Sequence, residues 1–211
     1  MSRLVLATRN AHKVGELRAI LGEHLPGVEV VGVDAFDADP ERAVGDVVES
    51  GVTFAENALL KARAVAAGTG LPAVADDSGI CVDVLGGAPG IFSARWCGRH
   101  GDDAENMRLL LAQLADVPAQ HRGARFACAA ALVLPDGSEH VELGELRGVL
   151  AAAPSGGGGF GYDPVLVPDA ERGPGGRGRS CAELSAGEKN AISHRGRAFR
   201  ALAPVVVQAL G

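Results

Sequence analysis

Apolar and polar residues alternate along the first fifty positions in a way that predicts two strands around one helix. Residues 4–7 and 28–33 form short apolar runs of strand length. Between them, residues 13–21 repeat apolar side chains every three or four positions, which is the spacing of an amphipathic helix. The acidic stretch 34–49 has neither period, so we expect a loop there with a weak edge element.

A helix with defined ends is predicted next. Thr53 and Glu56 have the spacing of a capping box, in which each side chain accepts a hydrogen bond from the other residue's backbone N–H. The helix is expected to run to about Ala67, and Gly68 and Gly70 then favour a helix end.

Two acidic residues interrupt the apolar pattern that follows. Residues 72–75 and 80–85 are strand-like, and the Asp-Asp-Ser-Gly sequence at 76–79 is typical of a turn. Side chains of neighbouring strand residues point to opposite faces, so Asp76 and Asp77 are expected to have different roles.

The second half of the chain carries the signals of a hairpin and of further helices. Residues 125–134 and 140–149 are apolar enough to be strands, and the Asp-Gly pair at 136–137 is a hairpin signal. Asp102 or Asp103 is placed to cap a helix that runs to Leu114. Residues 154–159 are expected to form a glycine loop and residues 165–167 a short strand, and the Gly/Arg-rich stretch 172–179 is expected to be mobile. A second capping box is predicted at 185–188, and the last helical region is expected to run to residue 210 and to be kinked or divided at Pro204.

Strands and helices interleave without the regularity of an all-parallel sheet, so we expect an α/β fold with a mixed sheet. A length of 211 residues predicts one domain over 1–211, with room for two lobes.

Composition excludes several classes of protein. A net charge of −6 argues against a protein that coats a nucleic acid polymer, although a local basic cleft can still bind a small anion. The four cysteines match no CxxC or zinc pattern, no apolar stretch reaches the ~18 residues of a membrane span, and the N-terminus has no signal-peptide pattern. We therefore expect a soluble cytoplasmic protein with reduced thiols, and neither a membrane nor a nucleic acid polymer as partner.

Lysine is scarce, and its positions coincide with segments suited to an anionic ligand. Of the 20 basic residues, only Lys13, Lys61 and Lys189 are lysines. The turn Thr8-Arg9-Asn10-Ala11-His12-Lys13 joins a strand to a helix, where free N–H groups and the helix dipole favour phosphate. The alternative is an N-capping loop with a surface lysine.

Two further segments have polar groups at spacings that suit a bound nucleotide. Asn57 and Lys61 are four residues apart and share a helix face, which is otherwise a solvated face. One carboxylate of the Asp76-Asp77 pair can hold Mg²⁺, because this ion binds one or two carboxylates together with substrate phosphates. Otherwise the pair belongs to a β-turn.

The last candidate segments combine an aromatic ring with hydrogen-bond donors. Phe160 follows the glycine run and offers a stacking plane for a nucleobase, or else it is a core residue beside a flexible loop. Lys189 and Ser193 share a helix face, and His194 and Arg195 are donors suited to carbonyl or phosphate oxygens. The alternative for this segment is an ordinary helix surface.

Six ordered blocks of the sequence resemble the inosine/xanthosine triphosphate pyrophosphatase family over nearly the whole chain. The blocks lie at residues 8–13, 51–62, 75–79, 85–95, 158–164 and 188–196. The resemblance implies an elongated two-lobed α/β fold around a long mixed β-sheet, with the active site in the cleft between the lobes, and a homodimer. The stretch 172–179 resembles nothing in the family core.

The resemblance also implies an enzyme that cleanses the nucleotide pool by hydrolysing ITP, dITP and XTP to the monophosphate and pyrophosphate with Mg²⁺. It assigns Asp77 as the general base and a metal ligand, and Glu49 is the candidate for a second metal ligand. The positions matching the family's substrate-binding residues are Thr8, Arg9, Asn10, Ala11, His12, Lys13, Lys61, Ser78, Phe160, Gly161, Tyr162, Asp163, Lys189, His194 and Arg195.

Specificity and two alternatives complete the hypothesis. A donor such as the Arg195 side chain would pair with the 6-oxo group of hypoxanthine or xanthine and reject the 6-amino group of adenine. A Maf-like pyrophosphatase for other modified nucleotides is one alternative, which the block 193–196 disfavours. A non-catalytic nucleotide-binding sensor is the other, which the intact pair of Asp76 and Asp77 disfavours.

Overall fold

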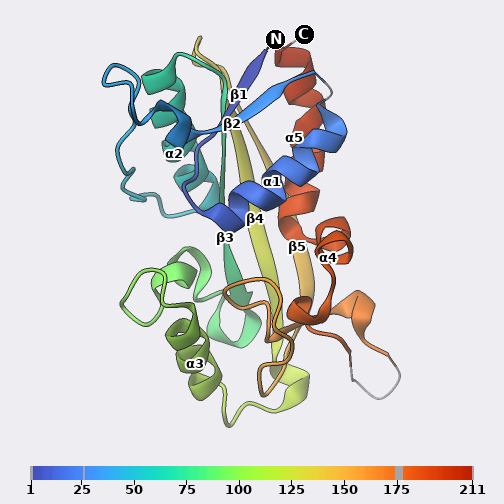
Figure 1. Ribbon diagram of the computed structural model, residues 1–211. Coiled ribbons are helices and arrows are strands. Elements are labelled where there is room, and N and C mark those ends of the chain that lie inside the picture. The colour runs from blue at the N-terminus through green and yellow to red at the C-terminus, as the bar shows by residue number, and fades with distance from the viewer. Residues whose placement is uncertain (1, 26, 174–177, 211) are drawn as a thin grey trace. The chain divides into compact units, whose positions relative to one another are not determined.

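The computed structural model describes residues 2–25, 27–173 and 178–210, and the side chain of His12 lies outside this description (Figure 1). Its six-stranded sheet comprises β1 (Arg3–Leu6), β2 (Glu29–Gly32), β3 (Ala73–Val82), β4 (Gly123–Val133), β5 (Glu139–Leu150) and β6 (Leu166–Pro168). The strand order is β2-β1-β3-β4-β5-β6. β1 pairs in parallel with β2 and β3, whereas β5 pairs in antiparallel with β6, so the predicted mixed sheet is confirmed.

Helices of two kinds accompany the strands. The α-helices of the described chain are α1 (Ala11–His24), α2 (Phe54–Thr69), α3 (Asp103–Gln113), α4 (Ala186–Ile192) and α5 (His194–Leu210). Short 3₁₀ helices lie at Val33–Phe36, Asp83–Leu85, Gly90–Arg95, Ala119–His121, Asp169–Glu171 and Cys181–Glu183. Within the described residues, no helix has both the length and the apolar character needed to cross a membrane.

The chain divides into two compact units. The first unit consists of Met1–Asp77, Cys128–Gly144 and Arg195–Gly211, and the second of Ser78–Ala127 and Glu145–His194. β3, β4 and β5 each contribute residues to both units, and the boundary within β3 falls directly after Asp77.

In the first unit both faces of the sheet are covered, with α1 and α5 on one face and α2 on the other (Figure 1). Successive strand residues point to opposite faces, and two apolar clusters follow this alternation. Leu4, Leu6 and Val74 belong to the cluster that includes side chains of α1 and α5. Their neighbours Val5 and Ala75 belong to the cluster that includes side chains of α2. Burial on both faces explains why these strands are continuous apolar runs in the sequence.

The second unit has its own apolar core. Ile80 of β3 and Phe126 of β4 pack in one cluster with Leu110 and Leu114 of α3. Tyr162 belongs to the same cluster and is 6% exposed. The only tyrosine of the chain is therefore part of the core that supports this unit.

The turn predicted at 76–79 is wrong, because β3 continues through it from Ala73 to Val82. The Asp-Asp-Ser-Gly sequence favours a turn only locally, whereas this segment is almost entirely buried within the sheet. The predicted opposite orientation of Asp76 and Asp77 follows from the same strand geometry, and the site described below shows it. The strand-like stretch after Gly79 also ends earlier than expected, at Val82, where a 3₁₀ helix begins.

Both ends of α2 differ in detail from the sequence expectation. Thr53 caps the helix by accepting from the backbone N–H of Glu56 at 3.1 Å, as predicted. The carboxylate of Glu56, however, accepts from the N–H of Val52 at 2.6 Å. The helix runs through Gly68 to Thr69 and is capped by Gly70, whose φ of 66° is in the left-handed region that suits a glycine at a helix C-terminus.

The structure also tests the predictions for the acidic stretch, the second capping box and the last helix. The stretch 34–49 contains no strand in the described structure, and its only regular element is the end of a 3₁₀ helix. The capping box of Ser185 and Glu188 is confirmed at the start of α4. Pro204 lies inside the continuous helix α5, so no new segment begins there. Part of the Gly/Arg-rich stretch 172–179, at residues 174–177, lies outside the described residues.

Candidate active site

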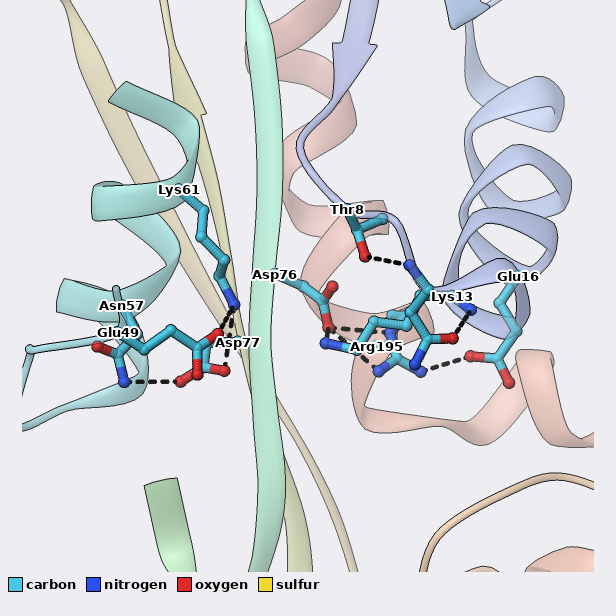
Figure 2. A network of polar contacts seen from close by, with 10 residues as sticks. Thr8, Lys13, Glu16, Glu49, Asn57, Lys61, Asp76, Asp77 and Arg195 are labelled. Carbon is cyan, nitrogen blue, oxygen red and sulfur yellow. Dashed lines mark hydrogen bonds and ion pairs between the residues drawn. The ribbon is translucent and has the colours of Figure 1, made fainter. Parts of the chain in front are cut away.

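Polar side chains form two groups on opposite sides of β3, one around Asp77 and the other around Asp76 (Figure 2). Both carboxylates belong to the first unit, as do all their partners named below. One group contains Asp77, Glu49, Asn57 and Lys61, and the other contains Asp76, Thr8, Lys13, Glu16 and Arg195. The sequence places these side chains far apart along the chain, and the sheet brings each group together.

The group around Asp77 is centred on the ammonium of Lys61. Its Nζ lies 3.3 Å from Oδ1 of Asp77 and 2.7 Å from Oε1 of Glu49. Asn57, fully buried on the same helix, donates from Nδ2 to Oδ2 of Asp77 at 3.1 Å. Asn57 and Lys61 therefore share a helix face, as predicted, but that face is turned toward a carboxylate and is not a solvated surface.

The electrostatics of this group favour a carboxylate that can accept a proton. Burial raises the pKa of Asp77, and the negative charge of Glu49 adds to this increase. The positive charge of Lys61 opposes the shift without cancelling it. For Lys61, burial would lower the pKa, but the neighbouring carboxylates outweigh that effect and raise it, so the ammonium stays charged.

The group around Asp76 has the opposite character. Oδ2 of Asp76 lies 3.1 Å from Nζ of Lys13 and accepts from Nε and Nη2 of Arg195, each at 3.1 Å. Nη1 of Arg195 donates to Glu16, so the guanidinium, whose side chain is only 2% exposed, bridges two carboxylates. Burial alone would raise the pKa of Asp76, but the attraction of Lys13, Arg195 and Lys61 outweighs it and brings the pKa below its usual range. Asp76 is thus a permanent anion that fixes two cations.

The segment between β1 and α1 is held by its own side chains. Oγ1 of Thr8 accepts from the backbone N–H of Asn10 at 3.2 Å, and Oδ1 of Asn10 accepts from that of Lys13 at 3.2 Å. This second bond satisfies one of the backbone donors at the start of α1, so the capping role considered for this loop is real. Lys13, however, is not a surface lysine, because its side chain is 17% exposed and paired with Asp76. Ala11 and His12 form the first turn of α1.

Arg9 connects this segment to the acidic loop that follows β2. Its guanidinium donates to both carboxylate oxygens of Asp37, at 2.6 and 2.8 Å, and to the carbonyl of Val44 at 2.8 Å. The acidic loop continues from Val44 to Glu49, so Arg9 anchors the segment that carries one of the two carboxylates at Lys61. Arg9 and Asp37 are 28 positions apart in the sequence, and no local sequence pattern predicts their pairing.

In the second unit, the predicted base-binding segment forms a tightly bonded loop. Oδ2 of Asp163 accepts from the backbone N–H of Phe160 at 2.8 Å and from Nζ of Lys189 at 2.7 Å. The same ammonium lies 5.0 Å from the centre of the Phe160 ring, in a cation–π arrangement. Tyr162 donates its hydroxyl to the carbonyl of Ser93 at 2.9 Å, and burial raises the pKa of that hydroxyl, so it remains a donor. Phe160 is therefore the side chain that this loop presents, while Tyr162 and Asp163 hold it.

Two other predicted residues of this unit occupy defined places. His194 begins α5, is buried, and stacks on Phe126 with ring centres 4.9 Å apart. Ser78 is partly buried in β3, directly after Asp77. The glycine run before Phe160 is bonded to the 3₁₀ helix Cys181–Glu183, since the N–H of Gly158 donates to the carbonyl of Ala182 at 3.0 Å.

The residues at Lys61 fit a divalent cation. In the described part of the chain, no cluster of three or more His, Cys, Asp or Glu side chains forms a metal site. Glu49 and Asp77 nevertheless converge on one cationic nitrogen, and two carboxylates completed by water and substrate phosphates are the set that Mg²⁺ commonly uses.

Two members of these groups are absent from the substrate-binding positions that the sequence predicted. Asn57 bonds to the candidate base, and its only sequence signal was its position one helical turn before Lys61. Glu16 bonds to Arg195, and its signal was its place three residues after Lys13 on the same helix. The pairing of Arg195 with a base edge stays a prediction, because its donors here contact Asp76 and Glu16.

Comparison with known proteins identifies the chain's relatives. Residues 4–205, nearly the whole chain, match the protein family described as Ham1. The chain belongs to the Ham1 family. A Ham1 relative from Streptomyces coelicolor, named dITP/XTP pyrophosphatase, is 65% identical over 211 residues, with 100% of both chains covered.

Solved structures of the Ham1 family are similar to this chain. A HAM1 protein from Coxiella burnetii has 37% identity and a TM-score of 0.84, with 99% of this chain and 100% of that chain covered. A nucleoside-triphosphatase/dITP/XTP pyrophosphatase from Mycobacterium abscessus has 49% identity and a TM-score of 0.73, with 96% and 99% covered. These Ham1 likenesses confirm both the predicted α/β fold class and the family that the six sequence blocks resemble.

Proposed function

We propose that this Ham1 protein hydrolyses ITP, dITP and XTP to the nucleoside monophosphate and pyrophosphate. The observation that carries the proposal is the convergence of Asp77 and Glu49 on the ammonium of Lys61, with the ammonium of Lys13 on the other face of β3. The relative from Streptomyces coelicolor named dITP/XTP pyrophosphatase supports the substrate class. The removal of such nucleotides cleanses the pool from which nucleic acids are made.

Asp77 is the proposed general base. It takes a proton from the water that attacks the α-phosphorus, while the bond from that phosphorus to the bridging oxygen breaks and pyrophosphate leaves. The raised pKa of Asp77, caused by burial and by Glu49, suits this role, because a base with a higher pKa accepts a proton more readily. The amide of Asn57 holds the other carboxylate oxygen and so fixes the direction of the one that acts.

Asp77 and Glu49 are also the proposed ligands of Mg²⁺. When bound, the ion neutralises charge that develops on the phosphoryl oxygens and orients the phosphates. Lys61 supplies a further positive charge at the same place, and Lys13 supplies one on the other face of β3. Thr8 and Asn10, with backbone N–H groups at the start of α1, add neutral hydrogen bonds for the phosphates.

The base of the nucleotide is the proposed partner of four other residues, Phe160, Lys189, His194 and Arg195. Phe160 offers its ring for stacking, and Lys189 approaches that ring and fixes it through Asp163. His194 and Arg195 remain the candidate donors to the 6-oxo group, which adenine lacks. A site that bonds this oxygen leaves its donors unpaired with adenine and thereby rejects ATP.

The test is the release of pyrophosphate from ITP, XTP, GTP and ATP, measured with and without Mg²⁺ as kcat/KM. We expect ITP and XTP to exceed ATP by at least ~10²-fold and the reaction to require the metal. A preference for ATP would overturn the proposal. Faster turnover of modified pyrimidine nucleotides would favour a Maf-like enzyme, and binding without turnover would favour a sensor.

The family resemblance supports two further proposals about how the enzyme exists. We infer a homodimer, to be tested by sedimentation equilibrium over a range of protein concentrations. A monomer at every concentration would contradict it. We also infer a cytoplasmic location, where nucleoside triphosphates are used, and cell fractionation with an antibody tests this.

A further inference from the structure

Three hydrogen bonds between a side chain and the backbone hold residues 160–163, the loop that presents Phe160, and all of them lie in the second unit. The hydroxyl of Tyr162 and the carboxylate of Asp163 make two of these contacts, as described above. The third comes from Asp103, the first residue of α3, whose Oδ2 accepts from the backbone N–H of Gly161 at 2.9 Å. This contact joins residues 58 positions apart, and Asp103 has no role in the site described so far.

Asp103 bonds to the loop at one of the two glycines that flank Phe160. Phe160 lies between Gly159 and Gly161, whose φ values of 71° and 61° are both in the left-handed region. Glycine loses more conformational freedom on ordering than any other residue, so a ring between two glycines needs external contacts to stay in one position. At Gly159 a side chain is also excluded, because a Cβ there would lie 2.0 Å from Oδ2 of Asp163.

Asp103 is not required for capping its own helix. Asp102 performs that function, because its Oδ1 accepts from the backbone N–H of Glu105 at 3.1 Å. The carboxylate of Asp103 reaches instead to Gly161, directly after the aromatic ring. Two consecutive acidic residues thus divide their work between the helix and the loop.

We propose that Asp103 is a positioning residue that pre-orders the loop and so presents Phe160 to the nucleobase. The inference rests on the proposed function only in taking a purine nucleotide as the ligand. Fixing the loop before the nucleotide arrives removes the entropy cost of ordering it on binding. Asp103 therefore affects affinity for the nucleotide, and it does not affect the chemical step at Asp77.

The first test measures the loop itself and needs no activity. Hydrogen–deuterium exchange is followed in the full-length protein for the peptide that contains Gly161, in wild type, Asp103→Ala and Asp103→Asn. We expect about tenfold faster exchange in Asp103→Ala and nearly unchanged exchange in Asp103→Asn, because the amide oxygen still accepts the bond. Glu105→Ala is the matched control, since it removes a carboxylate from the same helical turn whose partner is Arg108. Equal exchange in Asp103→Ala and wild type would overturn the inference.

The second test measures binding and turnover separately. Calorimetry with inosine 5′-monophosphate should show about tenfold weaker binding for Asp103→Ala, while kcat with saturating ITP stays within about twofold of wild type. Because Asp103 acts through the ring, adding Asp103→Ala to Phe160→Ala should weaken binding no further. Additive losses, unchanged affinity in Asp103→Ala, or no binding of the monophosphate by wild type would each contradict the inference. Binding without pyrophosphate release by wild type would instead contradict the proposed function and leave these comparisons valid.

Discussion

Asp76 and Asp77 are adjacent in β3, yet their carboxylates face opposite sides of the sheet and contact different lysines, Lys13 at 3.1 Å and Lys61 at 3.3 Å. Their pKa values move in opposite directions, because Lys13, Arg195 and Lys61 together outweigh burial at Asp76 whereas burial dominates at Asp77. One carboxylate is thereby fixed as an anion, and the other is able to accept a proton. Paired titratable groups with divergent pKa values are a common basis for dividing catalytic roles.

Asp77→Asn should abolish most turnover while nucleotide binding persists. The amide cannot accept a proton from water, so we expect a loss of at least ~10²-fold in kcat for ITP. Pyrophosphate release and calorimetric binding of ITP to the variant measure the two quantities. Turnover close to that of wild type would remove Asp77 from the role of base.

Asp76→Asn should act on stability more than on any single step. The substitution leaves the buried guanidinium of Arg195 and the ammonium of Lys13 without their shared anion, and breaking such a pair costs about 3 kcal/mol. Urea unfolding at neutral pH measures the difference from wild type. Asp77→Asn is the control, because it removes a carboxylate that burial already disfavours as an anion. Equal stability of the two variants would contradict the division of roles.

Glu49→Gln should weaken the response to Mg²⁺. The amide keeps the size of the side chain but removes one of two charges that converge at Lys61, so we expect about tenfold more Mg²⁺ for half-maximal activity. Titration of pyrophosphate release with the metal measures this. Glu56→Gln on the neighbouring helix is the matched control, since its carboxylate bonds to the backbone of Val52. An unchanged titration would exclude Glu49 as a ligand.

Lys13→Arg should reduce kcat/KM for ITP about tenfold while the fold persists. A guanidinium matches the carboxylate of Asp76 with two parallel donors and is larger than an ammonium, so it is drawn toward Asp76 and away from a phosphate. Steady-state kinetics and the midpoint of thermal unfolding separate the two effects. Normal kinetics would show that the scarcity of lysine in this chain has no catalytic meaning.

Local spacing predicted some of these features and not others. The capping box at the start of α4 and the Thr53 cap of α2 were predicted from four residues each, because capping is a local interaction, although the Glu56 half of the α2 box does not form. The strand through Asp76 and Asp77 was not, because the pairing and burial that override a turn sequence come from other strands. Likewise, nothing near Arg9 indicates Asp37, and nothing near Gly161 indicates Asp103. Partners that lie so far apart in the sequence can be identified only once the fold is known.

Glu188→Gln should change the pH dependence of stability in a defined window. Hydrogen bonds from Ser185, and then the hydrogen bond and charge of Arg179, lower the pKa of Glu188 from 4.5 to about 2. Because the folded state lowers this pKa, the ionised carboxylate stabilises the protein fully above pH 4.5, and this contribution disappears as the pH falls toward about 2. Urea unfolding at several pH values should therefore show a gap between wild type and Glu188→Gln that closes across this range. A gap that stays constant would contradict the assignment.

The alternation of side chains along β3 makes the chemistry of this protein depend on whether a residue's position is odd or even. A strand has a period of two, so inserting or deleting one residue before Asp76 exchanges the faces of everything that follows. The carboxylate that now meets Lys61 would then meet Lys13 and Arg195, and the reverse, with both residues still present in the sequence. Length changes in this family are therefore expected in loops or in pairs within this strand, because a single-residue change here alters function without changing composition.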